Sequence, residues 1–582
     1  MAKAINTRRR RALKTGLQGL GLSGLLTGCG SLSKVLDDEI KLDPDSHTES
    51  PQRLGGKKPT SAKEQGSAIT NHGQAPEKNP RITTESPAHA QRQDESSSIN
   101  ILSLLKLPAI EREFRAAWVA SVANIDWPSK PGLNSASLRA EIDRICAQAA
   151  FIGLNALIVQ IRPSADALYA SAIEPTSEFL VGQQGAALAD GFDPLSYWIQ
   201  SCKQHGLEFH AWFNPYRARH ASAKSGFHAK HLAKQQPKLV VKYGDQWWMN
   251  PAEPKALEWS LHVIDDVVSR YDIDGVHLDD YFYPYPIQAK DKKQSALDFP
   301  DETQYKRYRQ LGGRLDKPDW RRSHVDTMVQ KLYQRVHKQK PWVRVGISPF
   351  GIGKPALRPA GIQGFSQYDQ LFADVERWCS EAWLDYLAPQ LYWKIEQQSQ
   401  SFEVLLNYWS ERLGSKRHLW PGLYTSSIGQ AGRMWTSSEI LDQIQRQGRQ
   451  PLATGHIHFS MVALLNNRDQ IATLLHKGPY QRPSLVPSSP WLSKGRPERP
   501  QLIAPDQRGI LSWERPLGSQ PWGTTATRWV LHHRANEQSP WSMTHGDVNL
   551  NPIILKAKEQ YVLRLLNRVG EASDAIAFTW QI

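Results

Sequence analysis

Two adjacent carboxylates, Asp279 and Asp280, follow a short apolar stretch of the sequence and precede the aromatic residues Tyr281 and Phe282. Residues 275–281 have the composition of a short buried strand, and residues 259–268 have the apolar spacing of an amphipathic helix. Cleavage of a glycosidic bond requires one acid that protonates the leaving oxygen and one carboxylate that acts as nucleophile or base. We therefore expect this pair to be catalytic, with Asp279 as the nucleophile or base and Asp280 as the acid or a supporting residue.

The sequence leaves alternatives for the roles of these two carboxylates. In a regular strand, adjacent side chains point to opposite faces, so only one of the two would reach a site unless the strand ends before them. A structural alternative is that one of them caps the following loop or pairs with Arg115, Arg162 or Arg217. Four other carboxylates are alternative proton donors: Asp166, Glu178, Glu381 and Asp385.

Polar and aromatic residues lie at or just after the ends of several predicted strands. Such side chains suit hydrogen bonds to sugar hydroxyls and stacking on sugar rings. We expect the following residues to bind substrate: Arg162, Asp166, Asn214, Asn250, Gln390, Tyr392, Trp393 and Tyr424. His277, which alternates with Asp279, is interpreted as a core histidine. The sequence has no zinc-protease, EF-hand, P-loop or nucleophile-elbow motif, so it predicts neither a metal nor another cofactor.

The elements that would position these residues alternate between strand and helix patterns. Helical patterns such as 138–152 and 195–205 separate the predicted strands, and each strand ends in polar or aromatic residues. Eight strands are predicted, at residues 114–121, 156–162, 208–214, 275–281, 343–349, 386–393, 419–425 and 455–461. This rhythm predicts an α/β fold, a (β/α)8 TIM barrel over residues 104–480, whose active site lies at the carboxyl ends of the strands.

The C-terminal part of the chain changes in character. Residues 481–505 are rich in proline and are predicted to be a linker. Residues 506–582 contain short strand-like runs at 509–513, 528–532 and 560–566, which predict a small β-sandwich. The first and last of these runs resemble strands of fibronectin type III modules.

The N-terminus has the features of an export signal. Residues 1–28 combine a basic start with an apolar, glycine-rich run, and they precede Cys29. Residues 26–29 resemble a bacterial lipobox, which implies cleavage before Cys29 and attachment of lipid to this cysteine. Residues 29–103 are mostly polar and predict a disordered tether. We therefore expect an exported lipoprotein, anchored in a membrane of the cell envelope and facing the periplasm or the exterior.

The net charge of the chain limits its classes of partner, and the spacing of its cysteines indicates their chemical state. The net charge of +14 suits an anionic polymer. No basic helix with interleaved aromatic residues is present, so a nucleic-acid partner is not expected. The remaining cysteines, Cys146, Cys202 and Cys379, have no CxxC spacing and are predicted to be buried free thiols. No heptad pattern indicates an oligomeric state.

Segments spread along residues 112–475 together resemble the glycosyl-hydrolase-like family 10 of bacterial lipoproteins. The segments that carry this resemblance are residues 113–120, 160–169, 211–217, 249–251, 274–284, 346–351, 385–393 and 420–424. The family includes glycosidases that act on peptide-stripped strands of peptidoglycan. The resemblance therefore implies a barrel hydrolase that cleaves a glycan of the envelope. The alternatives are a catalytically inactive barrel that binds glycan as a scaffold, and a surface adhesin that has no affinity for sugar.

Overall fold

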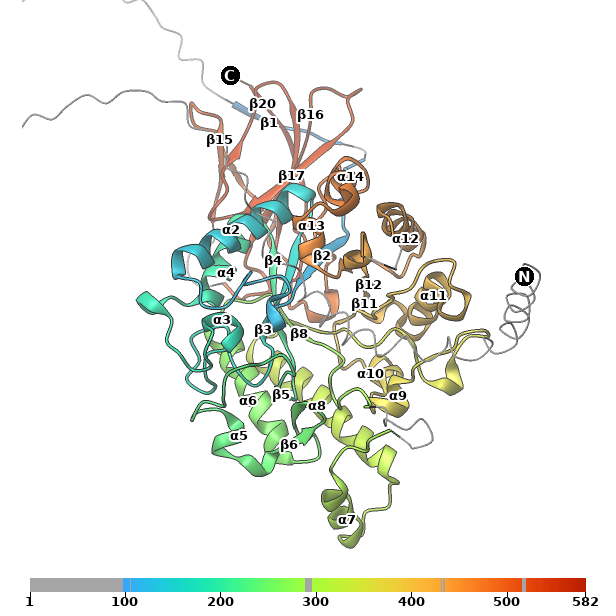
Figure 1. The fold of residues 1–582 in the computed structure, drawn as a ribbon. Helices are drawn as coiled ribbons and strands as arrows, with labels where there is room; N and C mark the ends of the chain where they lie inside the picture. The colour runs from blue at the N-terminus through green and yellow to red at the C-terminus, as the bar shows by residue number, and fades with distance from the viewer. Residues whose placement is uncertain are drawn as a thin grey trace, which may run out of the picture.

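The computed structural model describes residues 98–104, 106–287, 296–430, 432, 435–515 and 520–581 (Figure 1). The predicted signal peptide, Cys29 and most of the predicted tether lie outside the described residues. In the part of the chain that the structure describes, no helix is both long and apolar enough to cross a bilayer.

A closed sheet of parallel strands forms the centre of the molecule. Its strands are β2 (Phe114–Val119), β3 (Ala156–Arg162), β4 (Glu208–Phe213), β8 (Gly275–Leu278), β9 (Arg344–Ile347), β10 (Tyr386–Leu387), β11 (His418–Leu419), β12 (Gly422–Leu423) and β13 (Gly455–His458). Along the order β11-β10-β9-β8-β4-β3-β2-β13-β12 each strand pairs in parallel with the next. The sheet closes because its two ends, β11 and β12, are successive parts of one strand. The eight predicted strands and the barrel are thereby confirmed.

The seventh barrel strand is divided into β11 and β12 by Trp420 and Pro421. Proline has no backbone N–H to donate, so the ladder of hydrogen bonds is interrupted there. Strand β11 pairs with β10 on one side, and β12 pairs with β13 on the other. Isolated bridges from Gln390 to Gly422 and from Leu419 to Ala453 join each part to the other neighbour as well, so the break does not open the barrel.

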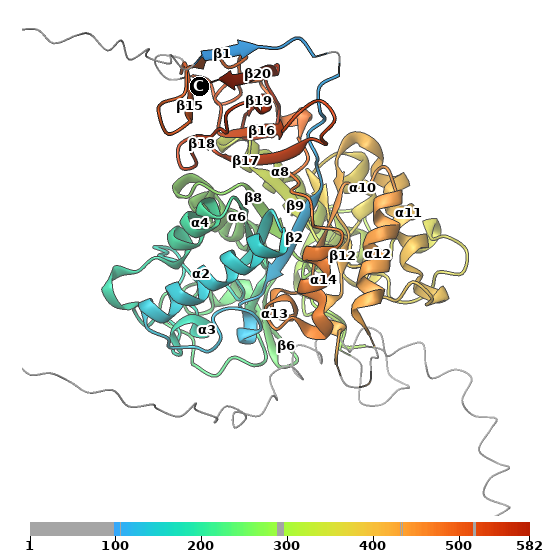
Figure 2. The ribbon, with the colours of Figure 1, turned by 90° about the horizontal axis from the view of Figure 1, so that it is seen from above.

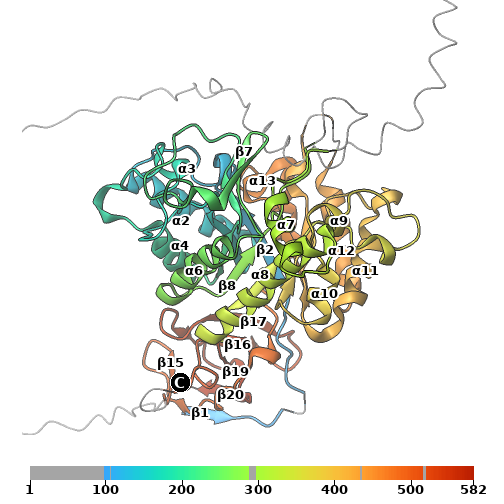
Figure 3. The ribbon, with the colours of Figure 1, turned by 90° about the horizontal axis from the view of Figure 1, so that it is seen from below.

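Helices surround the barrel, as Figures 2 and 3 show. The α-helices are α2 (Ser135–Ile152), α3 (Glu178–Val181), α4 (Pro194–Gln204), α5 (Leu232–Gln235), α6 (Pro254–Arg270), α7 (Glu302–Gln310), α8 (Lys317–Gln339), α9 (Gln367–Gln370), α10 (Val375–Ser380), α11 (Phe402–Leu413), α12 (Ser437–Arg449), α13 (Met461–Leu465) and α14 (Ile471–Lys477). Helix α6 begins with Pro254 and buries Leu261, Ile264 and Val268. This spacing places the apolar stripe on one helix face, against the barrel.

Large rings fill the interior of the barrel. Phe114 stacks on Trp420 with ring centroids 3.7 Å apart. The hydroxyl of Tyr386 lies 2.9 Å from Nδ1 of His210 and 3.0 Å from Nδ1 of His277. A Cβ atom at Gly346 would come within 1.8 Å of the Tyr386 ring, so glycine is required there. His277 is fully buried in this core, which agrees with its interpretation from the sequence.

Two antiparallel sheets form the C-terminal module. One has the order β1-β20-β19-β16-β17 and the other β14-β15-β18. Their strands are β1 (Ser98–Ile101), β14 (Leu502–Ile503), β15 (Ile510–Trp513), β16 (Arg528–Arg534), β17 (Ser542–Asp547), β18 (Ile553–Ile554), β19 (Gln560–Leu566) and β20 (Ile576–Gln581). Leu511, Ile553 and Phe578 belong to one apolar core that both sheets share. The arrangement is a small sandwich, and its likeness to fibronectin type III modules stays a prediction.

Two predicted boundaries need correction. Residues 98–101 were predicted to be the end of a disordered tether, yet they form β1, which pairs with β20. The backbone hydrogen bonds of a sheet edge stabilise this polar segment, and its composition alone does not reveal them. Strand β14 likewise lies inside the predicted linker 481–505 and pairs with β15.

The C-terminal module packs against the amino ends of the barrel strands (Figures 2 and 3). Glu208, at the start of β4, forms an ion pair of 2.9 Å with Arg344, at the start of β9. Arg568 of the module pairs with Asp272 and lies 3.5 Å from Asp274. The module therefore occupies the end of the barrel that is opposite to the carboxyl ends of the strands.

A further small sheet, which the sequence analysis did not predict, follows β4. It has the order β5-β7-β6, formed by Arg217–Arg219, Gln246–Met249 and Val240–Tyr243. It holds Arg217 at the side of the barrel where the carboxyl ends of the strands lie.

Candidate active site

An open cavity of about 580 Å³ lies at the carboxyl ends of the barrel strands. It is lined by Trp118, Ala120, Val122, Gln160, Trp212, Arg217, Asp279, Asp280, Tyr281, Tyr285, Ser348, Gln390, Tyr392 and Phe459. This is the face on which barrel enzymes carry their active sites.

Both carboxylates singled out from the sequence line this cavity. Strand β8 ends at Leu278, so the alternation of a regular strand no longer applies at Asp279 and Asp280. A turn follows, in which the backbone N–H of Phe282 donates to the carbonyl of Asp280 over 3.0 Å. Each of the two residues is only 3% exposed. The early end of the strand therefore brings both carboxylates to the site from the same wall.

Asp279 is held by donors from strand β4, from the residue after that strand and from its own loop. Its Oδ2 accepts a hydrogen bond of 3.0 Å from Nε1 of Trp212 and one of 3.3 Å from Nδ2 of Asn214. Its Oδ1 accepts from the backbone N–H of Tyr281 over 3.4 Å. Burial raises the pKa of Asp279 to about 7, although Arg217 and the Trp212 donor oppose the rise. Three donors thus favour the charged form in an apolar setting.

Asp280 is held by the loop that follows it and by the end of another strand. Its Oδ2 accepts a hydrogen bond from the hydroxyl of Tyr285. Burial raises its pKa to about 6, against the lowering effects of the hydrogen bonds from Tyr285 and Gln390. Between pH 6 and 7 the pair therefore holds about one proton, which is the state that acid–base catalysis requires.

Arg217 supplies positive charge to the cavity. Its Cζ lies 4.2 Å from the ring centroid of Tyr281, and its Nη1 donates to the carbonyl of Pro163 over 3.5 Å. Its backbone N–H donates to Oδ1 of Asn214, which fixes the start of β5. The guanidinium lowers the pKa of both catalytic candidates. From the sequence, Arg217 is expected only as a structural partner of the acids, although it follows a predicted strand end by three residues.

The remaining walls carry amides and aromatic rings. Gln390 donates from Nε2 to the carbonyl of Ser348 over 2.9 Å. Tyr392 stacks on Tyr424 with centroids 4.9 Å apart, and of the two only Tyr392 lines the cavity. Gln160, a lining residue that the sequence analysis missed, accepts from the backbone N–H of Val122 over 2.9 Å. The structure thus brings Gln390 and Tyr392 to the catalytic pair.

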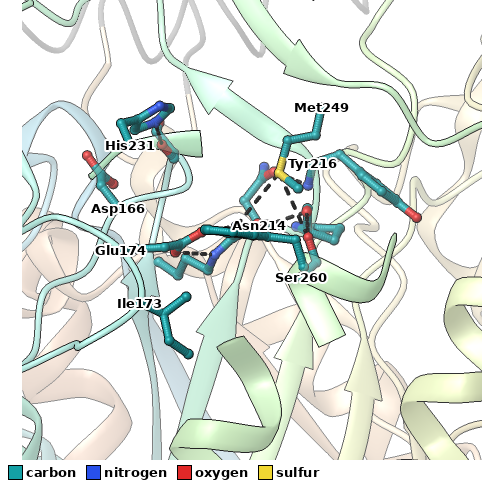
Figure 4. A network of polar contacts seen from close by, with 12 residues as sticks. Asp166, Ile173, Glu174, Asn214, Tyr216, His231, Met249 and Ser260 are labelled. Atoms are coloured by element: carbon teal, nitrogen blue, oxygen red, sulfur yellow. Dashed lines mark hydrogen bonds and ion pairs between the residues drawn. The ribbon is translucent and has the colours of Figure 1, made fainter. Parts of the chain in front are cut away.

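Other predicted substrate-binding residues lie beneath the surface of the site. Arg162 is 1% exposed and forms a buried ion pair of 2.6 Å with Glu174. Figure 4 shows Glu174, Asn214, Met249 and Ser260 around this network, with Asp166 and His231 to one side. Arg162 therefore does not line the cavity. Its charge is used within the protein, because a buried guanidinium needs a paired anion.

Asn214 and Asn250 are both fully buried. Asn214 acts through Asp279, to which it donates, whereas Oδ1 of Asn250 accepts from the backbone N–H of Ala252 over 3.0 Å. Asp166 is 2% exposed and accepts from Gln184 over 3.2 Å. Trp393 packs against Phe350 with centroids 5.4 Å apart. None of these residues lines the cavity.

The alternative proton donors lie away from the cavity as well. Glu178 accepts from the backbone N–H groups of Lys224 and Ser225. Asp385 accepts from the backbone N–H of Val345 at the opposite end of the barrel, and Glu381 follows α10. Among the described residues, Asp279 and Asp280 are the only carboxylates that line the cavity.

Residues 146, 202 and 379 are buried free cysteines. Within the described ranges, no three His, Cys, Asp or Glu side chains are grouped so that they could hold a metal ion. That the enzyme works without a cofactor stays a prediction.

Comparison with known proteins gives a consistent set of likenesses. Residues 113–437 match the family described as glycosyl hydrolase-like 10. Glycosyl hydrolase YngK of Bacillus subtilis (strain 168) is 39% identical over 412 residues, which cover 69% of this chain and 79% of that protein. Glycosyl hydrolase DigH of Escherichia coli (strain K12) is 30% identical over 361 residues, covering 57% of this chain and 78% of that protein. The PgaB (BpsB) glycoside hydrolase domain from Bordetella bronchiseptica superposes with a TM-score of 0.41 at 9% identity, over 63% of this chain and 98% of that one.

Proposed function

The chain belongs to the glycosyl hydrolase-like 10 family and is a glycoside hydrolase, and from that premise we propose that it cleaves glycosidic bonds in the glycan strands of peptidoglycan or a related envelope polysaccharide. The observation that carries this proposal is the buried pair Asp279 and Asp280 in an aromatic-lined cavity. Family membership also removes the two non-catalytic alternatives, an inactive scaffold and an adhesin.

The walls of the cavity suit a sugar ring. Trp118, Trp212, Tyr392 and Phe459 present aromatic surface, which stacks on the apolar faces of sugars. The guanidinium of Arg217 and the amide of Gln390 line the same space and can donate hydrogen bonds to sugar hydroxyls. Arg217 also favours a polymer with anionic groups. Peptide-stripped peptidoglycan has such groups, because each muramic acid then carries a free lactyl carboxylate.

We further propose that the enzyme is exported and held at a membrane by lipid on Cys29. The position of β1 supports this proposal, because the described chain enters through Ser98 at the edge of the C-terminal module. This module lies at the end of the barrel that is opposite to the cavity. A tether that joins at Ser98 would meet the described part of the molecule on the C-terminal module, at the end opposite to the cavity.

The substrate is tested with the full chain in detergent, incubated with peptide-stripped glycan strands, with intact peptidoglycan and with an unrelated glucan. Released fragments are read by mass spectrometry. We expect fragments whose masses correspond to cleavage between sugars of the stripped strands, and none from the glucan. Release from the glucan alone would contradict the proposed substrate. Membrane anchoring is tested by comparing the wild type with Cys29→Ala, which we expect to leave the membrane fraction.

A further inference from the structure

A buried ion pair, formed by Arg162 at the end of β3 and Glu174 in the loop that follows, lies outside the cavity. Nε of Arg162 donates to Oε2 of Glu174 over 2.7 Å, and Nη2 donates to Oε1 over 2.6 Å. Nε1 of Trp259, on α6, also donates to Oε1 of Glu174, over 2.8 Å. These three hydrogen bonds hold the guanidinium in one orientation, because its donors form a rigid planar fork.

Arg162 also holds the backbone of Asn214 at both of its polar groups. Its Nη1 donates to the carbonyl oxygen of Asn214 over 2.6 Å, and its own carbonyl oxygen accepts from the N–H of Asn214 over 2.9 Å. Figure 4 shows Glu174 and Asn214 in this network. Asn214 directly follows β4, which ends at Phe213. The ion pair therefore fixes the backbone at the point where β4 passes into its loop.

The side chain of Asn214 joins two charged residues that line the cavity, Asp279 and Arg217. Its Nδ2 donates to Oδ2 of Asp279 over 3.3 Å, and its Oδ1 accepts from the backbone N–H of Arg217 over 2.8 Å. Asn214 itself is fully buried and does not line the cavity. A displacement of Asn214 would therefore change the positions of a carboxylate and of a cation at the same time.

Stability alone does not account for an ion pair at this place. Burial removes the hydration of both ions, so apolar side chains of similar volume are often as stabilising as a buried ion pair, or more so. What an apolar pair cannot supply is a set of directed hydrogen bonds from one rigid group. In this protein one of those hydrogen bonds is donated to the backbone of Asn214.

We propose that Glu174 and Arg162 are positioning residues of the hydrolase, and that they act through Asn214 on the placement of Asp279 relative to Arg217. The inference rests on the proposed function, because it takes Asp279 as catalytic, and it extends that function to an ion pair outside the cavity. Catalytic groups depend on such supporting contacts for their productive geometry. A misplacement of about 1 Å can lower a rate by about 100-fold.

The first test compares two variants of the full chain in detergent, each of which neutralises the glutamate of a buried ion pair. Glu174→Gln changes the pair beside the site, and Glu208→Gln changes the pair of 2.9 Å with Arg344 at the amino ends of the barrel strands. Both should lower the melting temperature, because each leaves a buried arginine without its anion. Only Glu174→Gln should lower kcat on peptide-stripped glycan, by about 10- to 100-fold. Its KM should stay close to that of the wild type, because Glu174 does not line the cavity.

The pH dependence of kcat/KM is a second readout, which a merely structural role would not change. Asn214 favours the charged form of Asp279 by donating to it, and the Arg217 guanidinium lowers the pKa of Asp279. When both are displaced, the pKa of Asp279 rises, so the profile of Glu174→Gln should move to higher pH. An NMR titration of isotopically labelled aspartate carboxyl groups, with Asp279→Asn to assign the signal, should show the same rise. Glu208→Gln should match the wild type in both measurements.

Two further variants test the path through Asn214. Glu174→Asp keeps the negative charge beside Arg162 but has a shorter side chain, so it should lower kcat with a smaller loss of stability than Glu174→Gln. Asn214→Ala removes the side-chain contacts to Asp279 and to the N–H of Arg217. In the Asn214→Ala background, Glu174→Asp should lower kcat little further, because residues that act through one set of contacts have non-additive effects.

The outcomes separate this inference from the proposed function. Wild-type kcat and pH profile in both Glu174 variants would overturn the inference, and so would losses of Glu174→Asp and Asn214→Ala that multiply in the double variant. Equal losses of kcat in Glu174→Gln and Glu208→Gln would also overturn it, because the loss would then follow stability alone. Absence of glycan cleavage by the wild type would contradict the proposed function. The NMR titration would then decide the inference, which an unchanged pKa of Asp279 in Glu174→Asp would overturn.

Discussion

The indole N–H of Trp212 should increase the rate of cleavage measurably, because it donates a hydrogen bond to Oδ2 of Asp279 over 3.0 Å in a buried site. The variant Trp212→Phe removes this donor and keeps an aromatic ring. A hydrogen bond to a charged group contributes about 1.5 to 3 kcal/mol. If the charged form of Asp279 is needed in the transition state, kcat/KM should fall by about 10- to 100-fold, since each 1.4 kcal/mol corresponds to a factor of ten.

The pH profile gives this prediction a second readout. Loss of the donor raises the pKa of Asp279, because Trp212 stabilises its charged form. The basic limb of the profile, which reflects the higher pKa of the pair, that of Asp279, should therefore move to higher pH. The control Trp378→Phe removes an equivalent donor to Asp326, and it should lower stability without changing the profile. The reasoning would be refuted if Trp212→Phe kept the wild-type rate and profile while Asp279→Asn was inactive.

Four further predictions follow from the same contacts. The kcat/KM of the wild type should peak between pH 6 and 7 and fall on both sides, because the acid pair, with pKa values of about 7 and about 6, then holds one proton. The variant Arg217→Gln should move the whole profile to higher pH in the same assay, because the guanidinium lowers both of those pKa values. The variant Arg162→Met should lower the free energy of unfolding by about 3 to 5 kcal/mol in thermal or denaturant melts, since it leaves Glu174 buried and unpaired. Thiol titration should find three reactive groups in unfolded protein whose Cys29 carries lipid and none in native protein, because the three described cysteines are free and buried.

Each of these predictions has an outcome that contradicts it. If kcat/KM stays constant from pH 5 to 8, the protonation of the acid pair does not control the rate. If the Arg217→Gln profile is not shifted, the guanidinium does not affect the pKa values of the pair. If Arg162→Met, Glu174→Gln and the wild type have the same free energy of unfolding, the ion pair between Arg162 and Glu174 does not contribute to stability. A count of one thiol would indicate a disulfide between Cys146 and Cys202, whose sulfur atoms lie 3.7 Å apart.

The barrel can be predicted from the sequence because each of its strands and helices has a local sequence pattern. Buried parallel strands are short apolar runs, and the helices between them have apolar residues at helical spacing. Each element can therefore be recognised from a few consecutive residues. The break at Pro421 does not hide the strand, because residues on both sides of it are still apolar and paired. By contrast, β1 is a four-residue strand in a polar segment, and its partner β20 lies at the other end of the chain. No local pattern encodes such a pairing.

The candidate site can be predicted only in part, because local patterns do not show how the loops pack. Asp279 and Asp280 stood out because they follow an apolar run, but the end of β8 at Leu278 was needed to place both in the cavity. Arg162 and Asn250 also follow strands, yet they are buried beneath the loops. Arg217 reaches the site through β5, which belongs to an added sheet. Position after a strand therefore indicates the correct end of the barrel, whereas loop packing decides which side chains are exposed there.

The most direct test of the account compares Asp279→Asn with Asp326→Asn in one measurement, the initial rate of fragment release from peptide-stripped glycan strands. Both substitutions neutralise a buried carboxylate that accepts a hydrogen bond from a tryptophan, but only Asp279 lines the cavity. The account predicts that Asp279→Asn loses at least about 100-fold in rate and that Asp326→Asn stays close to the wild type. Equal rates for the two variants would contradict the assignment of the active site.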